Sequence, residues 1–143
     1  MKASASASSL LLVILMTVSL AMLLSACSRP KVSSDLCGTY VANYKVASEK
    51  LILDKDGKFT QEVTIKATSK VDVAKGKWRY DPKDGHIRFE DTYMSVLDGF
   101  GEFNPNYAHP KPGVYTTEVD KLFGTIRIGV YVNEQNVVYK KVK

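Results

Sequence analysis

The sequence has 143 residues and a net charge of +5, with 20 basic side chains against 15 acidic ones. This length fits about one domain, and two cysteines are too few for a disulfide-stapled scaffold. The positive charge does not indicate a nucleic-acid-binding protein, because the lysines are scattered along the predicted strands and the N-terminus indicates export.

Residues 1–26 have the pattern of a secretory signal. Lys2 gives a positive start, residues 10–24 are almost wholly apolar, and small residues follow. Signals have an apolar segment of about 7–15 residues, whereas a membrane-spanning helix prefers roughly 20. We therefore predict a cleaved signal peptide, and an uncleaved membrane anchor remains the alternative.

The signal ends in Leu24-Ser25-Ala26-Cys27. This pattern resembles the lipobox of bacterial lipoprotein precursors. The resemblance implies a diacylglycerol thioether (and further acylation, such as palmitate) on Cys27 and cleavage just before it, so the partner would be a membrane. Ser28, in place of Asp, implies the periplasmic face of the outer membrane in a two-membraned bacterium. An ordinary secretory cut after Ala26 is the alternative.

Residues 27–36 are polar and contain Pro30, so we expect a lipidated tether without secondary structure. A domain follows over residues 37–143. If Cys27 is acylated, Cys37 has no partner within the chain. An odd thiol in an exported protein is either buried or available for intermolecular pairing; burial is the favoured interpretation, because free cysteine behaves as a small apolar group.

The domain shows the alternation of β-strands. Apolar residues recur at every second position, which is typical of strands with one face inward. "DKDG" and "DPKDG" then predict hairpin turns, with Gly57 and Gly85 taking positive φ. The inward residues of the first half are Tyr40, Ala42, Tyr44, Val46, Leu51, Leu53, Phe59, Val63, Ile65, Ile87 and Phe89.

One stretch breaks the alternation. Val71 and Val73 are odd-numbered, whereas Trp78 and Tyr80 are even-numbered. A strand changes faces only through an extra residue, so we predict a bulge or sharp bend at Gly76.

Three further strands are predicted over 114–120, 124–132 and 136–142. The total is about eight, joined mainly by hairpin-length connections. The sequence therefore predicts an all-β fold, a small antiparallel up-and-down barrel. Eight strands enclose either packed side chains or one small ligand.

Four motifs, "GTY" at 38–40, "LILDKDGKF", "GKW" at 76–78 and "HIRFED", are similar to those of small bacterial lipocalin-like lipoproteins. Tyr40 stands where the Gly-x-Trp signature has tryptophan. The resemblance covers about residues 37–142 and implies a barrel with a cavity for an apolar molecule. We expect Trp78 and Phe89 to line that interior.

Residues 92–113 form a long irregular segment rich in proline, glycine and aromatic residues. Such segments in compact domains are usually functional or disordered. Phe100, Phe103 and Tyr107 are therefore candidates for a lid or a partner-binding patch. The alternative is that these side chains plug one end of the barrel.

Candidates for chemistry are few. No nucleophile elbow, metal-binding His pattern or cofactor motif is present. A hydrolytic site using Glu90, Asp91 or Glu102 with His109 is the alternative; we expect no catalytic residues, no metal and no cofactor.

Two functions stay open. The first is a lipid-anchored envelope protein, not an enzyme, that binds a small apolar ligand inside the barrel. The second is a barrel filled with side chains that meets an envelope protein through the 92–113 loop. Large aromatic side chains meeting at the centre would favour the second.

Overall fold

The computed structural model describes residues 27–94, 110–132 and 135–142. Its secondary structure is almost entirely strand. The elements are β1 (Cys27–Ser28), η1 (Ser33–Leu36), β2 (Gly38–Asn43), β3 (Ala47–Leu53), β4 (Lys58–Ile65), β5 (Lys70–Asp81), β6 (His86–Glu90), β7 (Thr92–Tyr93), β8 (Lys111–Pro112), β9 (Tyr115–Leu122), β10 (Thr125–Val132) and β11 (Gln135–Lys141).

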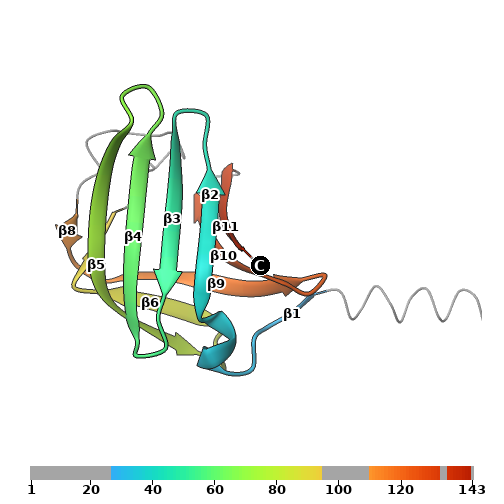
Figure 1. The fold of residues 1–143 in the computed structure, drawn as a ribbon. Helices are drawn as coiled ribbons and strands as arrows, with labels where there is room; N and C mark the ends of the chain where they lie inside the picture. The colour runs from blue at the N-terminus through green and yellow to red at the C-terminus, as the bar shows by residue number, and fades with distance from the viewer. Residues whose placement is uncertain (1–26, 95–109, 133–134, 143) are drawn as a thin grey trace, which may run out of the picture.

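Eight antiparallel strands form a closed barrel (Figure 1). The order β9-β10-β11-β2-β3-β4-β5-β6 closes through a β6–β9 pair. Each barrel strand therefore neighbours the strands before and after it in the chain, and the ends meet at β11 and β2. This confirms the predicted all-β up-and-down barrel, including its last three strands.

The two glycine turns are those predicted from the sequence. Gly57 has φ +79° and its N–H donates to the carbonyl of Asp54. Gly85 has φ +73° and its N–H donates to the carbonyl of Asp81. Glycine adopts positive φ without the Cβ clash that penalises other residues, so these positions set the lengths of the β3–β4 and β5–β6 hairpins.

The predicted bulge at Gly76 is wrong. The β4–β5 register runs without interruption from Lys58↔Lys77 to Ile65↔Lys70. Val71 and Val73 are exposed, at 51% and 45%, so the even-numbered residues face inward from Asp72 to Tyr80. Two valines on the outer face misled the prediction, because exposed apolar residues are common on protein surfaces.

The segment expected to be an unstructured tether lies against the barrel. β1 pairs with the end of β9, with Cys27 opposite Leu122. Pro30 is buried, and its carbonyl accepts a hydrogen bond from the Tyr80 hydroxyl at 2.9 Å. Leu36 is fully buried in the core. The position of Cys27 relative to the barrel is thus fixed by pairing and packing.

Candidate functional site

Aromatic side chains fill the barrel interior. The Phe89 ring packs edge-on against Phe59, with centroids 5.1 Å apart, and stacks on Tyr93 at 4.9 Å. Tyr93 in turn stacks on Tyr115 at 4.5 Å with the rings nearly parallel. Phe89 and Phe59 are almost completely buried. Phe89, predicted to line a ligand cavity, is therefore a core residue in contact with other side chains.

A polar cluster lies among these rings, centred on Glu49 of β3. The carboxyl is 3% exposed. One of its oxygens accepts a hydrogen bond from the Tyr44 hydroxyl at 2.6 Å. The other accepts hydrogen bonds from the Gln61 amide, at 2.7 Å, and from the Tyr139 hydroxyl. Both oxygens are thus satisfied, as a buried carboxyl requires.

Burial raises the pKa of Glu49 above its ordinary value, because the charged form loses its hydration. The hydrogen bonds from Tyr139, Tyr44 and Gln61 oppose this shift. The raised pKas of neighbouring tyrosines have a similar origin: burial, and then the nearby Glu49 carboxyl, raises the pKa of Tyr115 to about 12. Burial therefore disfavours the charged forms of Glu49 and of the tyrosines around it, and the hydrogen bonds to Glu49 offset part of this effect.

We predict a pH dependence for Glu49→Gln. A carboxyl with a raised native pKa binds its proton more tightly in the folded state, so stability falls as pH rises through the unfolded pKa near 4.5. The variant lacks this loss, and its stability relative to wild type should increase from pH 4 to pH 7. The expected increase is about 1.4 kcal/mol for each unit by which the native pKa is raised.

Urea unfolding followed by Trp78 fluorescence at both pH values measures this difference. Glu62→Gln is the matched control, because Glu62 lies on the neighbouring strand β4 in an exposed ion pair with Lys50, at 3.3 Å. The control should change little. A Glu49→Gln effect of equal size at both pH values would contradict the prediction.

Gln61 connects the polar cluster to the irregular segment. Its side-chain oxygen accepts a hydrogen bond from the Met94 N–H, and its amide donates to the Met94 carbonyl, both at 2.9 Å. Gln61 is fully buried and Met94 is 1% exposed. The Gln61 side chain thus satisfies both the N–H and the carbonyl of Met94 and holds this residue inside the barrel.

The irregular segment leaves and re-enters the described fold at a short stem. β7 pairs with β8, with Thr92 opposite Pro112, and the Gly113 N–H donates to the Asp91 carbonyl at 3.0 Å. The Thr92 hydroxyl also donates to the Lys75 carbonyl at 2.6 Å. Both ends of the 95–109 segment are therefore attached to the barrel. The predicted residues Phe100, Phe103, Tyr107, Glu102 and His109 lie outside the described residues.

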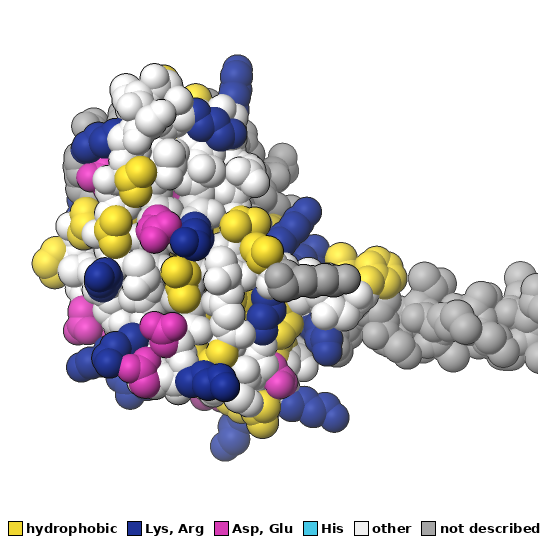
Figure 2. All heavy atoms as spheres, viewed as in Figure 1, with side chains coloured by type: hydrophobic (Ala, Val, Ile, Leu, Met, Phe, Trp, Pro, Cys, Tyr) yellow, Lys and Arg dark blue, Asp and Glu magenta, His cyan; other side chains and the backbone are white. Residues whose placement is uncertain are grey.

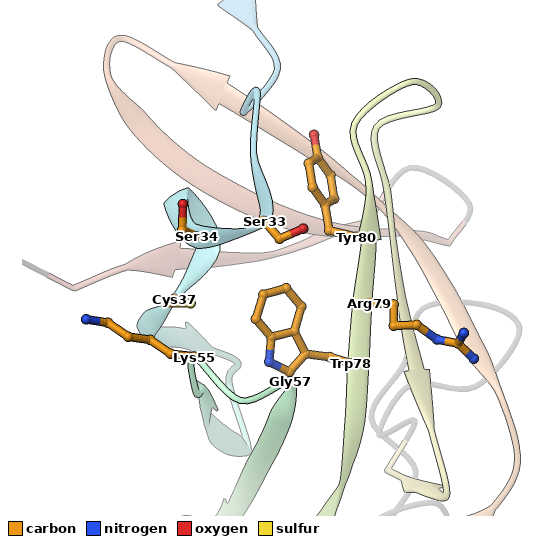
Figure 3. Close-up of a pocket in the computed structure, with 8 residues that line it drawn as sticks. All are labelled: Ser33, Ser34, Cys37, Lys55, Gly57, Trp78, Arg79 and Tyr80. Carbon is orange, nitrogen blue, oxygen red and sulfur yellow. The ribbon is translucent and has the colours of Figure 1, made fainter.

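Trp78 borders a pocket of about 400 Å³, a size that accepts a small organic molecule. The pocket lies between η1, the turn that joins β3 to β4, and strand β5. Figure 3 shows the indole projecting toward Ser33 and Cys37, while the Lys55 and Arg79 side chains extend away on opposite sides. The indole N–H donates to the Asp54 carbonyl at 3.1 Å, so the ring is fixed and offers an apolar surface.

Cys37 also lines this pocket and is a free thiol. It is half-buried and packs against the core. The Cys37 thiol is therefore neither fully buried nor fully exposed.

The other titratable candidates do not converge on a cleft within the described chain. Glu90 forms ion pairs with Arg79 and, at 3.1 Å, with Arg88 on the outer surface. The hydrogen bond from Arg79 is the main reason that the pKa of Glu90 is lowered. Asp91 is exposed at the turn after β6.

Sequence reasoning missed Glu49 and Gln61. Both occupy inward positions in strands whose other inward residues are apolar: Leu51 and Leu53 in β3, Phe59 and Val63 in β4. A polar residue at an inward position was the available signal, because such a residue needs internal hydrogen-bond partners.

No family model, curated protein or solved structure matches the chain. The class that the structure defines is a closed, eight-stranded, antiparallel up-and-down β-barrel. Among residues 27–94, 110–132 and 135–142, no helix has the length and apolar character to cross a membrane.

Proposed function

We propose that this protein is a lipid-anchored barrel of the bacterial cell envelope, not an enzyme, that meets an envelope protein through the 92–113 loop. The observation that carries the proposal is the filled interior. Phe59, Phe89 and Tyr93 pack against one another in the core of the barrel, in space that a lipocalin-like ligand would otherwise need. Packed side chains therefore occupy the interior, and the 92–113 loop is the better candidate for binding a partner.

The stem of the loop supports the same proposal. Gln61 and the β7–β8 pair fix Met94 and Lys111, which lie next to the two ends of the 95–109 segment. That segment contains Phe100, Phe103 and Tyr107. Aromatic residues are enriched in protein interfaces, and attachment at both ends lowers the entropy lost on binding.

The lipid anchor is tested by palmitate labelling in a bacterial host. We expect the protein to be labelled and to enter the detergent phase, with Cys27 as the modified N-terminus. Cys27→Ser should lose both properties. Cys37→Ser is the matched control and should keep both. An unmodified N-terminal Cys27 in the wild-type protein would overturn the anchor, and the outer-membrane location with it.

The loop is tested with a photo-cross-linking amino acid at position 103 in cells. We expect one discrete protein adduct that is absent when the same amino acid replaces Val73, which is exposed on the outer face of β5. Addition of Phe100→Ser should abolish the adduct. Equal cross-linking from positions 103 and 73 would contradict a loop-specific partner.

The Trp78 pocket favours a second candidate function, binding of a small apolar ligand at the barrel surface. A native mass spectrum of the mature protein would then show an adduct that is lost on denaturation. Ser34→Trp adds a large ring to the exposed side of the pocket and should remove that adduct. A spectrum without any adduct, or an adduct unaffected by Ser34→Trp, would count against this site.

A further inference from the structure

The β9–β10 turn carries an aromatic residue where turn geometry disfavours one. Leu122 pairs with Thr125, which leaves Phe123 and Gly124 as a two-residue turn. Their φ values are +48° and +84°, typical of a type I′ turn. Asn-Gly is the preferred sequence there, because residues with a bulky side chain are strained at positive φ. Phe123 therefore has a conformational cost that a simple turn residue would avoid.

Phe123 also has a solvation cost. Its side chain is 79% exposed, compared with 41–56% for the other exposed large hydrophobic residues. A Cβ at the neighbouring Gly124 would meet nothing within 4 Å. Nothing in the described fold thus explains an aromatic residue at this tip. A residue that is both strained and exposed is a candidate for contact with a membrane or with another molecule.

The location of the β9–β10 turn favours a membrane as the partner of Phe123. Leu122, next to Phe123, is the pairing partner of Cys27. Paired strands lie about 4.8 Å apart, so the turn lies beside the residue proposed to carry the lipid. Figure 1 shows the β9–β10 hairpin reaching the corner of the barrel where β1 begins. A lipid on Cys27 would hold this corner against the bilayer.

Charge at the same corner fits an anionic membrane surface. Lys121 pairs with Ser28, and Arg29 and Lys31 follow β1 on the exposed surface. Figure 2 shows hydrophobic side chains at the right-hand edge of the described barrel, with Lys and Arg side chains near them. An exposed apolar residue with basic residues in the adjoining strands is typical of segments that bind at the lipid headgroup level.

We propose that Phe123 inserts into the headgroup region of the membrane that holds the lipid on Cys27. This inference rests on the proposed lipid anchor. The lipid and the hairpin tip would form two contacts at one corner, which would orient the barrel instead of leaving it free to rotate on its anchor.

The test places a fluorophore at the tip. Phe123→Trp is prepared as the mature protein in vesicles of phosphatidylethanolamine and phosphatidylglycerol that contain brominated phospholipid. Because interfacial side chains enter the bromine-accessible layer, emission from the introduced indole should fall at least about twofold. Val73→Trp on β5 is the matched control and should not be quenched, and neither should the native Trp78, which is 5% exposed.

A second variant separates membrane contact from folding. Phe123→Asn installs the residue that a type I′ turn prefers, so its unfolding equilibrium constant should fall about fivefold. In vesicles, lysines near the tip should become more accessible to amine-reactive reagents. A less stable Phe123→Asn variant would show that Phe123 has a packing role and would overturn the inference.

The outcomes distinguish this inference from the lipid anchor, because the mass of Cys27 is measured on the same Phe123→Trp sample. Lipidated protein in which the introduced indole is not quenched would overturn the hairpin contact alone. A blue shift of that indole without quenching would indicate a protein contact and would overturn it as well. Unlipidated protein whose introduced indole is quenched on added vesicles would support the hairpin and overturn the anchor.

Discussion

Replacement of Gln61 by leucine is expected to lower the free energy of unfolding by about 3–5 kcal/mol. The Gln61 amide makes hydrogen bonds to Glu49, to Tyr139 and to both backbone groups of Met94. Leucine fills most of the volume but leaves the Met94 N–H and carbonyl without partners inside the barrel. Each buried polar group without a partner costs about 1–3 kcal/mol.

Urea unfolding followed by Trp78 fluorescence measures this loss. Amide hydrogen exchange should also show faster exchange of the Met94 N–H, because its acceptor has been removed. Glu62→Leu, at the next position of β4, is the control. It removes an exposed ion pair with Lys50 and should change stability by less than about 1 kcal/mol. A Gln61→Leu loss no larger than that of the control would contradict the assigned role.

Gly76→Ala is expected to lower the free energy of unfolding by about 2–3 kcal/mol. A Cβ at this position would overlap the carbonyl oxygen of Glu90 and lie 2.8 Å from Cε1 of the Phe59 ring. The backbone atom cannot move without separating β5 from the end of β6. Insertion of a methyl group into a packed site costs about 1–3 kcal/mol.

Gly113→Ala is the matched control for this substitution. A Cβ there would meet nothing within 4 Å, and φ at Gly113 is not positive. Its stability should be unchanged or raised by about 0.5 kcal/mol, because alanine restricts the unfolded chain. Equal effects of the two substitutions, measured by thermal unfolding, would show that close approach at Gly76 is not limiting.

Much of the barrel could be predicted from the sequence because the information is local. Alternation of Phe59 and Val63 with polar residues predicted one inward face of β4, and Gly57 and Gly85 mark the turns. These signals depend on the geometry of a few consecutive residues. The error at Gly76 has a similar origin: Val71 and Val73 look like core residues until a neighbouring strand defines the inside.

The candidate site was predicted less well. Both Trp78 and Phe89 were expected to line a cavity inside the barrel; Phe89 is part of the packed core, and Trp78 is buried beside a pocket at the barrel surface. The Glu49–Gln61–Tyr139 cluster joins three strands, and Gln61 and Tyr139 are 78 positions apart. Closure of the barrel brings these side chains together, and no local pattern encodes which ones meet.

The sequence by itself determined the strands, their turns and the up-and-down order, since hairpin-length connections leave consecutive strands little choice but to pair. It also predicted an export signal and a cysteine that is the candidate for lipid attachment. Only the tertiary structure decided that the interior is filled, that Gln61 holds Met94, and that Phe123 lies beside Cys27. Those outcomes depend on volumes and pairings between distant segments, which become defined only when the barrel closes.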